Sequence, residues 1–315
     1  MNNKQFSVDI CIATFKRPDL LLEALSSLSA QKLENICMRV IVVDNDREES
    51  ARYTVETFAK KVSFEVVYDV EPVQSIPQVR NRAISHIKAE YFAFIDDDET
   101  VPSDWLATMI AAMKKYNADV VFGPVIGILP VNAPAWTKKH PCFDRPRRAS
   151  GSLMKTGATG NVLIRRDALG QPALLFDSAY DLTGGSDTDF FTRLYNDGKI
   201  MVWCDDALAY EHVPPERVTV SWVCRRSFRG GQGFARIQSS VVRMAGWGMY
   251  KTMQFLGSLI LLPFFRIFSY SYYVNLLCLG CAALGCLSVF IFGNAFLYKE
   301  YNAKYYRKSP IEKIK

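Results

Sequence analysis

The amino-acid sequence predicts an α/β protein with a mostly parallel, doubly wound sheet, followed by apolar helices near its C-terminal end. Strand-like and helix-like segments alternate up to about residue 240. The strand-like segments are almost continuously apolar, which is typical of parallel strands that are buried on both faces. Long uncharged runs then begin after Lys251. With 315 residues, 49% of them apolar and 22% charged, the composition excludes a disordered or fibrous chain.

The first strand is predicted at 8–14, and Pro18 then begins an amphipathic helix whose leucines recur at helical spacing. Further strands are predicted at 38–44, 64–70, 91–96 and 118–125, with helices at 77–87 and about 102–115. Such alternation of strands and helices favours a single large sheet with helices on both faces.

Polar residues follow the predicted strands where each strand ends. They are Thr14, Asp44 and the acidic run Asp96 to Glu99. In open α/β sheets the ligand crevice lies outside the carboxyl ends of the strands. We therefore expect these three groups, distant in the chain, to meet at one crevice.

A stretch rich in Pro, Arg and Lys interrupts the pattern at 126–156. One interpretation is a long loop that covers or frames a site. The other is a solvated surface insertion, and the sequence does not decide between them.

The chain from Lys251 onward has the composition of a membrane-associated segment. Fourteen uncharged residues (252–265) precede Arg266, and thirty-two more follow at 267–298. The second run is long enough to cross a bilayer, which needs about 20 residues. The first is short and contains Pro263, so it is predicted as a tilted half of a hairpin or as an interfacial helix. The alternative is a buried helical subdomain.

Basic residues flank these runs on both sides, which places both flanks in the cytoplasm and favours a hairpin or an in-plane arrangement over one crossing. The net charge of +6 is read as attraction to anionic lipid, and no nucleic-acid-binding motif accompanies it. The flanking residues are Arg225, Arg226, Arg229, Arg236, Arg243 and Lys251, then Lys299, Lys304, Arg307, Lys308, Lys313 and Lys315.

The N-terminal residues lack the apolar stretch of a secretory signal, so we expect a cytoplasmic protein with reduced thiols. Among the eight cysteines, Cys278 and Cys281 form a C-x-x-C pair inside an uncharged run. With no histidine or second pair nearby, packing residues are favoured there over a zinc site.

The acidic run is the strongest candidate for chemistry. If the strand continues, Asp96 and Asp98 point to the same side. Carboxylate oxygens suit a hard divalent ion, so Mg²⁺ or Mn²⁺ is the predicted cofactor. The alternative is a solvated turn whose carboxylates cap the helix after Pro102.

Four motifs in this order give the chain a recognisable character: ATFKRP (13–18), VIVVDN (40–45), IPQVRNRAI (76–84) and YFAFIDDDE (91–99). Together they resemble glycosyltransferase family 2, the inverting enzymes with the Rossmann-like GT-A fold. More narrowly, the chain is similar to bacterial glucosyltransferases of succinoglycan-type exopolysaccharide assembly. The resemblance covers roughly residues 7–240.

The resemblance implies a nucleotide pocket. Thr14 would line it, and Asp44 would accept a hydrogen bond from the uracil ring edge. Arg80 and Asn81 match an Arg-Asn pair near the nucleotide. For two of these residues a structural role stays open, since Asp44 can cap a turn and Arg80 can form an ion pair on a helix surface.

The acidic run matches the family's D-x-D motif. By the resemblance, Asp96 and its neighbour Asp97 belong to the nucleotide-sugar site, and Asp98 is a metal ligand. His212, in AYEHVPP, matches a histidine that often completes the metal site, while a structural role for this histidine is the alternative.

The segment TGGSDTDFFTRL (183–194) matches the region where relatives carry Glu-Asp at a helix start. Here the pair is Ser186-Asp187, so the first position departs from the pattern. The resemblance makes Asp187 the catalytic base, with Asp189 as the rival and a helix-capping role as the alternative.

A basic segment, VCRRSFRGGQG, carries Arg225, Arg226 and Arg229. It resembles a segment near the donor diphosphate in this family. Contact with lipid head groups is an equally open interpretation.

The resemblance implies an inverting, metal-dependent hexosyltransferase that uses a UDP-sugar, most simply UDP-glucose. The acceptor would be a polyprenyl-diphosphate-linked glycan in exopolysaccharide or surface polysaccharide synthesis. Residues 1–240 are predicted as the catalytic domain and 241–315 as membrane-associated helices with a basic tail, at the cytoplasmic face of the inner membrane. The alternatives are a catalytically inactive, membrane-anchored nucleotide- or glycan-binding protein and, less in keeping with the Gly-free ATFKRPDL, a sugar nucleotidyltransferase.

Overall fold

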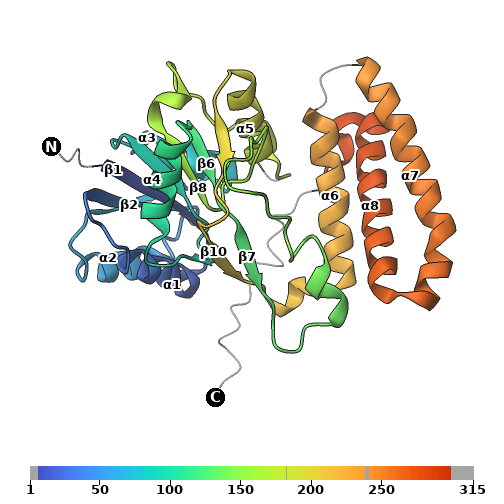
Figure 1. Ribbon diagram of the computed structural model, residues 1–315, viewed down its shortest axis with the longest axis horizontal. Coiled ribbons are helices and arrows are strands. Elements are labelled where there is room, and N and C mark those ends of the chain that lie inside the picture. Colours follow the sequence, from blue (N-terminus) through green and yellow to red (C-terminus); the bar gives the residue numbers. More distant parts are fainter. Residues whose placement is uncertain (1–5, 182, 238–240, 299–315) are drawn as a thin grey trace.

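Four strands from the first hundred residues form one half of the main sheet (Figure 1). In a computed structural model of the chain, which describes residues 6–181, 183–237 and 241–298, β1 (Phe6–Thr14) lies between β2 (Ile36–Asp44) and β4 (Tyr91–Phe94). β3 (Val66–Val70) pairs with the other edge of β2. All three of these pairings are parallel. The carboxyl ends of β1, β2 and β4 therefore lie at the same edge of the sheet, as predicted.

The second half of the sheet contains its antiparallel exception. β8 (Val162–Arg165) runs antiparallel between β4 and β6 (Val120–Phe122), and β9 (Met201–Trp203) is parallel to β6. Within the described residues the order is β3-β2-β1-β4-β8-β6-β9. The prediction of a mostly parallel α/β sheet is confirmed.

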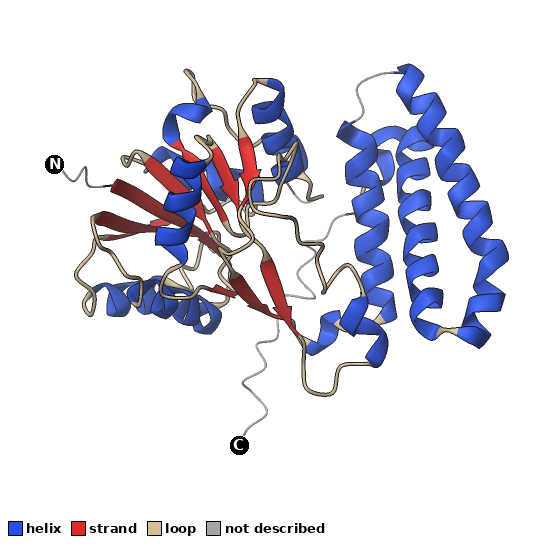
Figure 2. Ribbon diagram, in the orientation of Figure 1, coloured by secondary structure: helices blue, strands red, loops and turns tan. Residues whose placement is uncertain are grey.

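Helices cover both faces of this sheet (Figure 2). One face packs against α1 (Pro18–Ser29), α2 (Arg52–Ala59) and α4 (Trp105–Lys115). The other packs against α3 (Ile76–Ser85) and α5 (Ser186–Asn196). Side chains of β1 alternate between these two apolar cores, which explains why its sequence reads as a continuous apolar run.

The predicted strand at 118–125 is instead two strands in two sheets. It is interrupted at Gly123-Pro124, after which β7 (Val125–Ile128) joins a small sheet with β10 (Ala209–His212) and β5 (Glu99–Thr100). A Cβ at Gly123 would lie 2.2 Å from the carbonyl oxygen of Ala207, so only glycine allows this close crossing. The small sheet positions the loop that follows β7 beside the carboxyl edge of the main sheet.

Short 3₁₀ segments connect the larger elements. The stretch predicted as a loop, 126–156, begins in β7 and contains η1 (Ala135–Lys139). The others are η2 (Arg166–Leu169), η3 (Ser178–Tyr180), η4 (Pro215–Arg217) and η5 (Gly293–Phe296).

Three helices follow the sheet domain: α6 (Val220–Ile237), α7 (Val241–Phe268) and α8 (Tyr270–Phe292). α6 lies beside the sheet domain, α8 lies against α6, and α7 is outermost (Figure 1). In the part of the chain that is described, the segments Gly246–Phe268 and Tyr270–Phe292 have the length and apolar composition of membrane spans. The predicted basic tail after Tyr298 lies outside the described residues.

A buried ion pair stabilises the sheet between β1 and β2. The guanidinium of Arg39 donates to both carboxylate oxygens of Asp9 (2.9 and 2.8 Å), and the backbone N–H groups of Lys88 and Ala89 also donate to Asp9. Asp9 is 2% exposed and Arg39 is 9% exposed. The pair therefore holds the α3–β4 connection against the amino ends of β1 and β2.

Arg39→Met is expected to lower the free energy of unfolding by about 3 kcal/mol, because it leaves the Asp9 carboxylate buried without its cation. Urea denaturation followed by circular dichroism measures this change. The double variant Asp9→Asn with Arg39→Met is expected to be less destabilised than Arg39→Met alone, since the uncompensated charge is then gone. Equal stability of wild type and Arg39→Met would contradict this account.

Candidate active site

A cleft of about 1240 Å³ lies at the carboxyl edge of the main sheet. It is lined by the ends of β1 and β10, the acidic turn after β4, the start of α5 and one face of α6. Residues 141–143, 145 and 146 of the loop after η1 also line it. This loop therefore frames the site, which is the first of the two interpretations of 126–156. The predicted convergence of chain-distant polar groups is thus observed for Thr14 and the acidic run.

The acidic turn is held by groups from the first strand and the loop after it. The Thr14 hydroxyl donates to Asp97 (2.8 Å), and Nη1 of Arg17 contacts both Asp97 and Asp98 (3.1 Å each). Glu99, 2% exposed, accepts from the backbone N–H of Asp96 (3.0 Å). Arg17 lies in the quoted ATFKRP motif, yet sequence reasoning did not single it out.

The four carboxyl groups of the turn, Asp96 to Glu99, lie close enough to repel one another when ionised. Burial, with the charges of neighbouring carboxylates, raises the pKa of Asp96 to about 6 and that of Asp97 to about 7. Burial and the nearby aspartates also raise the pKa of Glu99 well above its usual value. The Asp96 side chain is nevertheless 51% exposed, and it faces the cleft. A positively charged ligand in the cleft would therefore relieve repulsion among these groups.

The carboxylates of this turn are the hard oxygen donors that Mg²⁺ and Mn²⁺ prefer, so their chemistry fits a divalent ion. Asp98 and His212 both line the cleft. Asp98, however, lies beside Arg17 and, at 3.8 Å, Arg217. Among the described residues, no three His, Cys, Asp or Glu side chains are grouped as a ready metal site. Metal ligation by Asp98 and His212 stays a prediction.

Asp44 does not line the cleft. It is fully buried, and its carboxylate accepts from the backbone N–H groups of Asp46 and Ala51 and from the Tyr68 hydroxyl. These bonds are those of a turn-capping residue, the alternative considered from the sequence. The geometry gives no support to a contact between Asp44 and uracil, which stays a prediction.

Arg80 and Asn81 separate in the structure. Arg80 lies in the cleft between the acidic turn and α5, 3.9 Å from an Asp96 oxygen and 3.5 Å from the Ser186 hydroxyl. The Asn81 side chain instead donates to and accepts from the backbone of Phe176. Asn81 thus holds the loop at Phe176 in place, and it is not among the residues that line the cleft.

Asp187 lines the cleft from the first turn of α5. Its charge is close enough to contribute to the raised pKa of Asp96. The rival Asp189 is paired with Arg193 at 2.8 Å and does not line the cleft. Of the two aspartates, the geometry favours Asp187 as a base.

Ser186, the departure from the family pattern, is 2% exposed. A glutamate at this position would place another carboxylate beside Arg80 and the acidic turn. The serine at this position offers Arg80 a neutral hydroxyl, 3.5 Å away.

The three arginines of α6, Arg225, Arg226 and Arg229, all line the cleft. The guanidinium of Arg226 lies over the Trp222 ring, with 5.3 Å between them. These arginines and the acidic turn thus line the same cleft. This favours the interpretation in which they contact an anionic ligand of the site.

Glu211 and its partners are a feature that sequence reasoning missed. Glu211, 7% exposed, pairs with Arg217 (2.7 Å) and with Arg145 from the framing loop. Although burial acts to raise it, the two arginines hold the pKa of Glu211 below its usual value. Glu211 directly precedes His212, and its position next to this predicted site residue was the sequence feature that could have identified it. The network ties the framing loop to β10.

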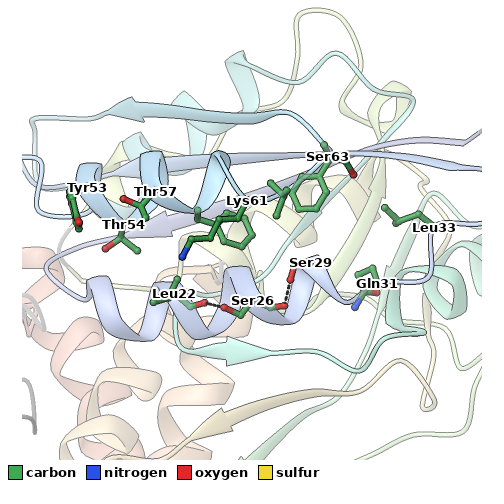
Figure 3. A pocket seen from close by; sticks show the side chains of 13 residues that line it. Leu22, Ser26, Ser29, Gln31, Leu33, Tyr53, Thr54, Thr57, Lys61 and Ser63 are labelled. Carbon is green, nitrogen blue, oxygen red and sulfur yellow. Dashed lines mark hydrogen bonds between the residues drawn. The ribbon is translucent and has the colours of Figure 1, made fainter.

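A second hollow, of about 730 Å³, lies between α1 and α2 (Figure 3). It is lined by hydroxyls and apolar side chains, including Ser26, Tyr53 and Phe64, with Lys61 as a charged group. No carboxylate lines it. Because acidic and basic groups converge only in the larger of these two hollows, we assign the chemistry to the larger one.

Comparison with known proteins places this arrangement in a family. Residues 9–171, more than half of the chain, match the model of Glycosyl transferase family 2. The chain belongs to glycosyltransferase family 2. A second family model, Glycosyl transferase family group 2, matches residues 91–287.

Curated relatives within the family agree with this assignment. The chain is 36% identical over 239 residues to the succinoglycan biosynthesis protein ExoM of Rhizobium meliloti (strain 1021), which covers 75% of this chain and 77% of that protein. It is 24% identical over 246 residues to the chondroitin synthase of Pasteurella multocida (strain Pm70), covering 68% of this chain but 25% of that protein.

Solved structures show the same fold at low sequence identity. S. aureus TarS 1–349 in complex with UDP-GlcNAc aligns with a TM-score of 0.54 and 14% identity, covering 90% of this chain and 92% of TarS 1–349. The mannosyltransferase PcManGT of Pyrobaculum calidifontis, in complex with GDP-Man and Mn²⁺, aligns with a TM-score of 0.57 and 18% identity, covering 91% and 75% of the two chains. The expected GT-A fold and family 2 membership are therefore confirmed.

Proposed function

We propose that this family 2 glycosyltransferase moves a sugar, most simply glucose, from a UDP-sugar to a polyprenyl-diphosphate-linked glycan in exopolysaccharide synthesis. The observation that carries the proposal is the placement of Asp187 in the same cleft as the acidic turn and the α6 arginines. The relative in succinoglycan biosynthesis and the UDP-GlcNAc complex of TarS support the choice of donor and pathway class.

In this proposal Asp187 removes the proton of an acceptor hydroxyl as that oxygen attacks the anomeric carbon from the face opposite UDP. The bond to the UDP oxygen breaks on the other face, so an α-linked donor gives a β-linkage. Arg225, Arg226 and Arg229 face the diphosphate and stabilise the charge that develops on it.

Asp98 and His212 are the residues that would hold a Mg²⁺ or Mn²⁺ ion. When bound, such an ion supplies neutralisation of the negative charge on the diphosphate. Thr14 and Arg17 hold the acidic turn in position for that ligand, and Arg80 sets the distance between the turn and α5.

We further propose that the protein acts at the cytoplasmic face of the inner membrane, where α7 and α8 associate with lipid. Two helices of suitable length and composition support the association with a membrane. A lipid-linked acceptor would then be delivered along the bilayer surface to the cleft beside α6.

A catalytically inactive binding protein on the same fold is the second candidate, and Ser186 in place of the family's glutamate is the observation that favours it. Release of the nucleoside diphosphate (UDP or GDP, according to the donor) by the detergent-purified full chain separates the two candidates. UDP-glucose, UDP-GlcNAc and GDP-mannose are each supplied with and without a polyprenyl-diphosphate glycan. The enzyme is expected to release UDP from a UDP-sugar faster with acceptor. Binding of the UDP-sugar without any release would support the inactive protein instead.

A further inference from the structure

The outermost helix, α7, exposes large apolar side chains from residue 247 to its end at Phe268. Met253 is 65% exposed, Ile260 76% and Ile267 80%. Within Gly246–Phe268, only 6% of the most apolar part of the helix is buried. No charged residue occurs from 252 to 265. A continuous exposed apolar surface of this kind marks an interaction site. Because this surface carries no charge along about four helical turns, the hydrocarbon of a membrane is the environment that fits it.

The neighbouring helix, α8, is packed on two opposite sides, while Tyr272 (62% exposed) and Ile291 (68% exposed) lie on its remaining surface. It runs parallel to α6 and in close contact with it, so that Gln232 bonds to Ser288 (3.0 Å) and Ala235 packs on Cys286. A Cβ at Gly285 would lie 1.9 Å from the carbonyl oxygen of Phe228. On its other side α8 packs against α7 through Gly280 and Ser258. α8 is therefore the middle helix of a layer, as Figure 1 shows.

The first helix of the layer, α6, is attached to the catalytic domain. Arg236 donates to the Thr183 hydroxyl (2.7 Å) and to the Ala179 carbonyl (2.8 Å), while three further arginines of α6 line the cleft. If α8 crossed a bilayer, the contacting part of α6 would lie at the same depth. Four arginines and the polar cleft would then be immersed in hydrocarbon, where charged groups are strongly disfavoured.

The charges at the two ends of the apolar run of α7 point the same way. Arg266 is exposed three residues before the α7–α8 turn at Ser269, and a spanning hairpin would carry it across the membrane against the positive-inside preference. Lys251, at the other end, lies 5.4 Å from the centre of the Tyr250 ring and 5.9 Å from that of Trp247. Amphipathic rings and cations of this kind favour the head-group level of a membrane.

We infer that α7 lies in the plane of the membrane with its apolar face in one leaflet, that α8 is the supporting layer behind it, and that neither helix crosses the bilayer. The inference rests on the proposed membrane association and adds its topology. Since packed helices lie about 10 Å apart, the α6 face of the cleft stands roughly 20 Å from α7. A lipid-linked substrate can thus enter the cleft from the leaflet that holds α7.

The position of the α7–α8 turn tests this topology. The full chain with Ser269→Cys is added to preformed liposomes of phosphatidylglycerol and phosphatidylethanolamine, so the catalytic domain stays outside. A membrane-impermeant maleimide is either applied outside or trapped in the lumen, and labelled peptides are identified by mass spectrometry. The exposed native Cys37 reports the side of the catalytic domain, and labelling in detergent confirms that the introduced thiol reacts.

The in-plane arrangement predicts that the lumenal reagent labels neither Cys37 nor the thiol introduced at position 269. A spanning hairpin predicts lumenal labelling at position 269 and external labelling at Cys37, and this result would overturn the inference. If the wild-type protein does not float with the liposomes at all, the proposed membrane association itself fails, which is a separate outcome.

A matched pair of variants tests which surface enters the lipid. Ile260→Lys, on the outer face of α7, is expected to lower the liposome partition constant about tenfold or more. Tyr53→Lys is the control, because Tyr53 lies on α2 and is similarly exposed (81%), and it is expected to leave the partition constant unchanged. Unchanged partitioning of Ile260→Lys would mean that something other than lipid, such as a second copy of the chain, covers α7, and would overturn the inference.

Discussion

Asp187→Asn is expected to lower the turnover number about 100-fold or more while leaving the affinity for UDP unchanged. The amide cannot accept the acceptor's proton, yet it keeps the size and the N-terminal helix position of the carboxylate. Because Asp187 lines the cleft together with the acidic turn, the change removes proton abstraction and leaves the arginines of α6 in place. Steady-state kinetics with the identified UDP-sugar, together with calorimetric titration of UDP, measures both quantities.

Asp189→Asn is the matched control, two residues along the same helix. Asp189 pairs with Arg193 and does not line the cleft, so its turnover is expected to stay near that of the wild type. If Asp187→Asn were fully active and Asp189→Asn inactive, the assignment of the base would be reversed. Loss of UDP binding in Asp187→Asn would instead point to a role in donor binding.

Asp98→Asn is expected to weaken UDP binding in the presence of Mn²⁺ about tenfold or more, because a metal site loses a charged oxygen ligand. In EDTA the same substitution is expected to have little effect. Asp104→Asn, on the exposed start of α4 and away from the cleft, is the control and should match the wild type.

The structure also defines the outcome that would contradict the metal assignment. Asp98 contacts Arg17 at 3.1 Å, and its negative charge helps to raise the pKa of Asp96. If Asp98 serves only this ion pair, its neutralisation would reduce repulsion toward UDP. Binding would then be unchanged or tighter in Asp98→Asn, and EDTA would not affect the wild type.

The fold was predictable where local sequence decides structure. The apolar strands at 8–14, 38–44 and 91–96 correspond to β1, β2 and β4, and their polar ends follow directly from the strand boundaries. The split of the segment at 118–125 was not predicted, since it depends on the approach of Ala207 to Gly123, two segments more than eighty residues apart.

The candidate site divides in the same way. Thr14, the acidic turn and Asp187 were predicted from motifs, and the structure brings them to one cleft. Asp44 and Asn81 belong to equally recognisable motifs. Their side chains, however, form hydrogen bonds with backbone groups and do not line the cleft, which only the folded structure reveals.

The partners of the acidic side chains were the least predictable part. Arg145 and Arg217 reach Glu211 from a loop and a short 3₁₀ segment without regular periodicity. Likewise, the sequence left open whether the C-terminal runs span the membrane, because the packing of Gly285 against α6 is a property of two helices and not of one.

Calorimetric titration of UDP, GDP and dTDP into the detergent-purified full chain, with Mn²⁺ and with EDTA, tests the central claim most directly. We predict binding of UDP alone, dependent on the metal. Absence of nucleotide binding by a protein that is folded by circular dichroism would contradict the assignment of the cleft as a UDP-sugar site.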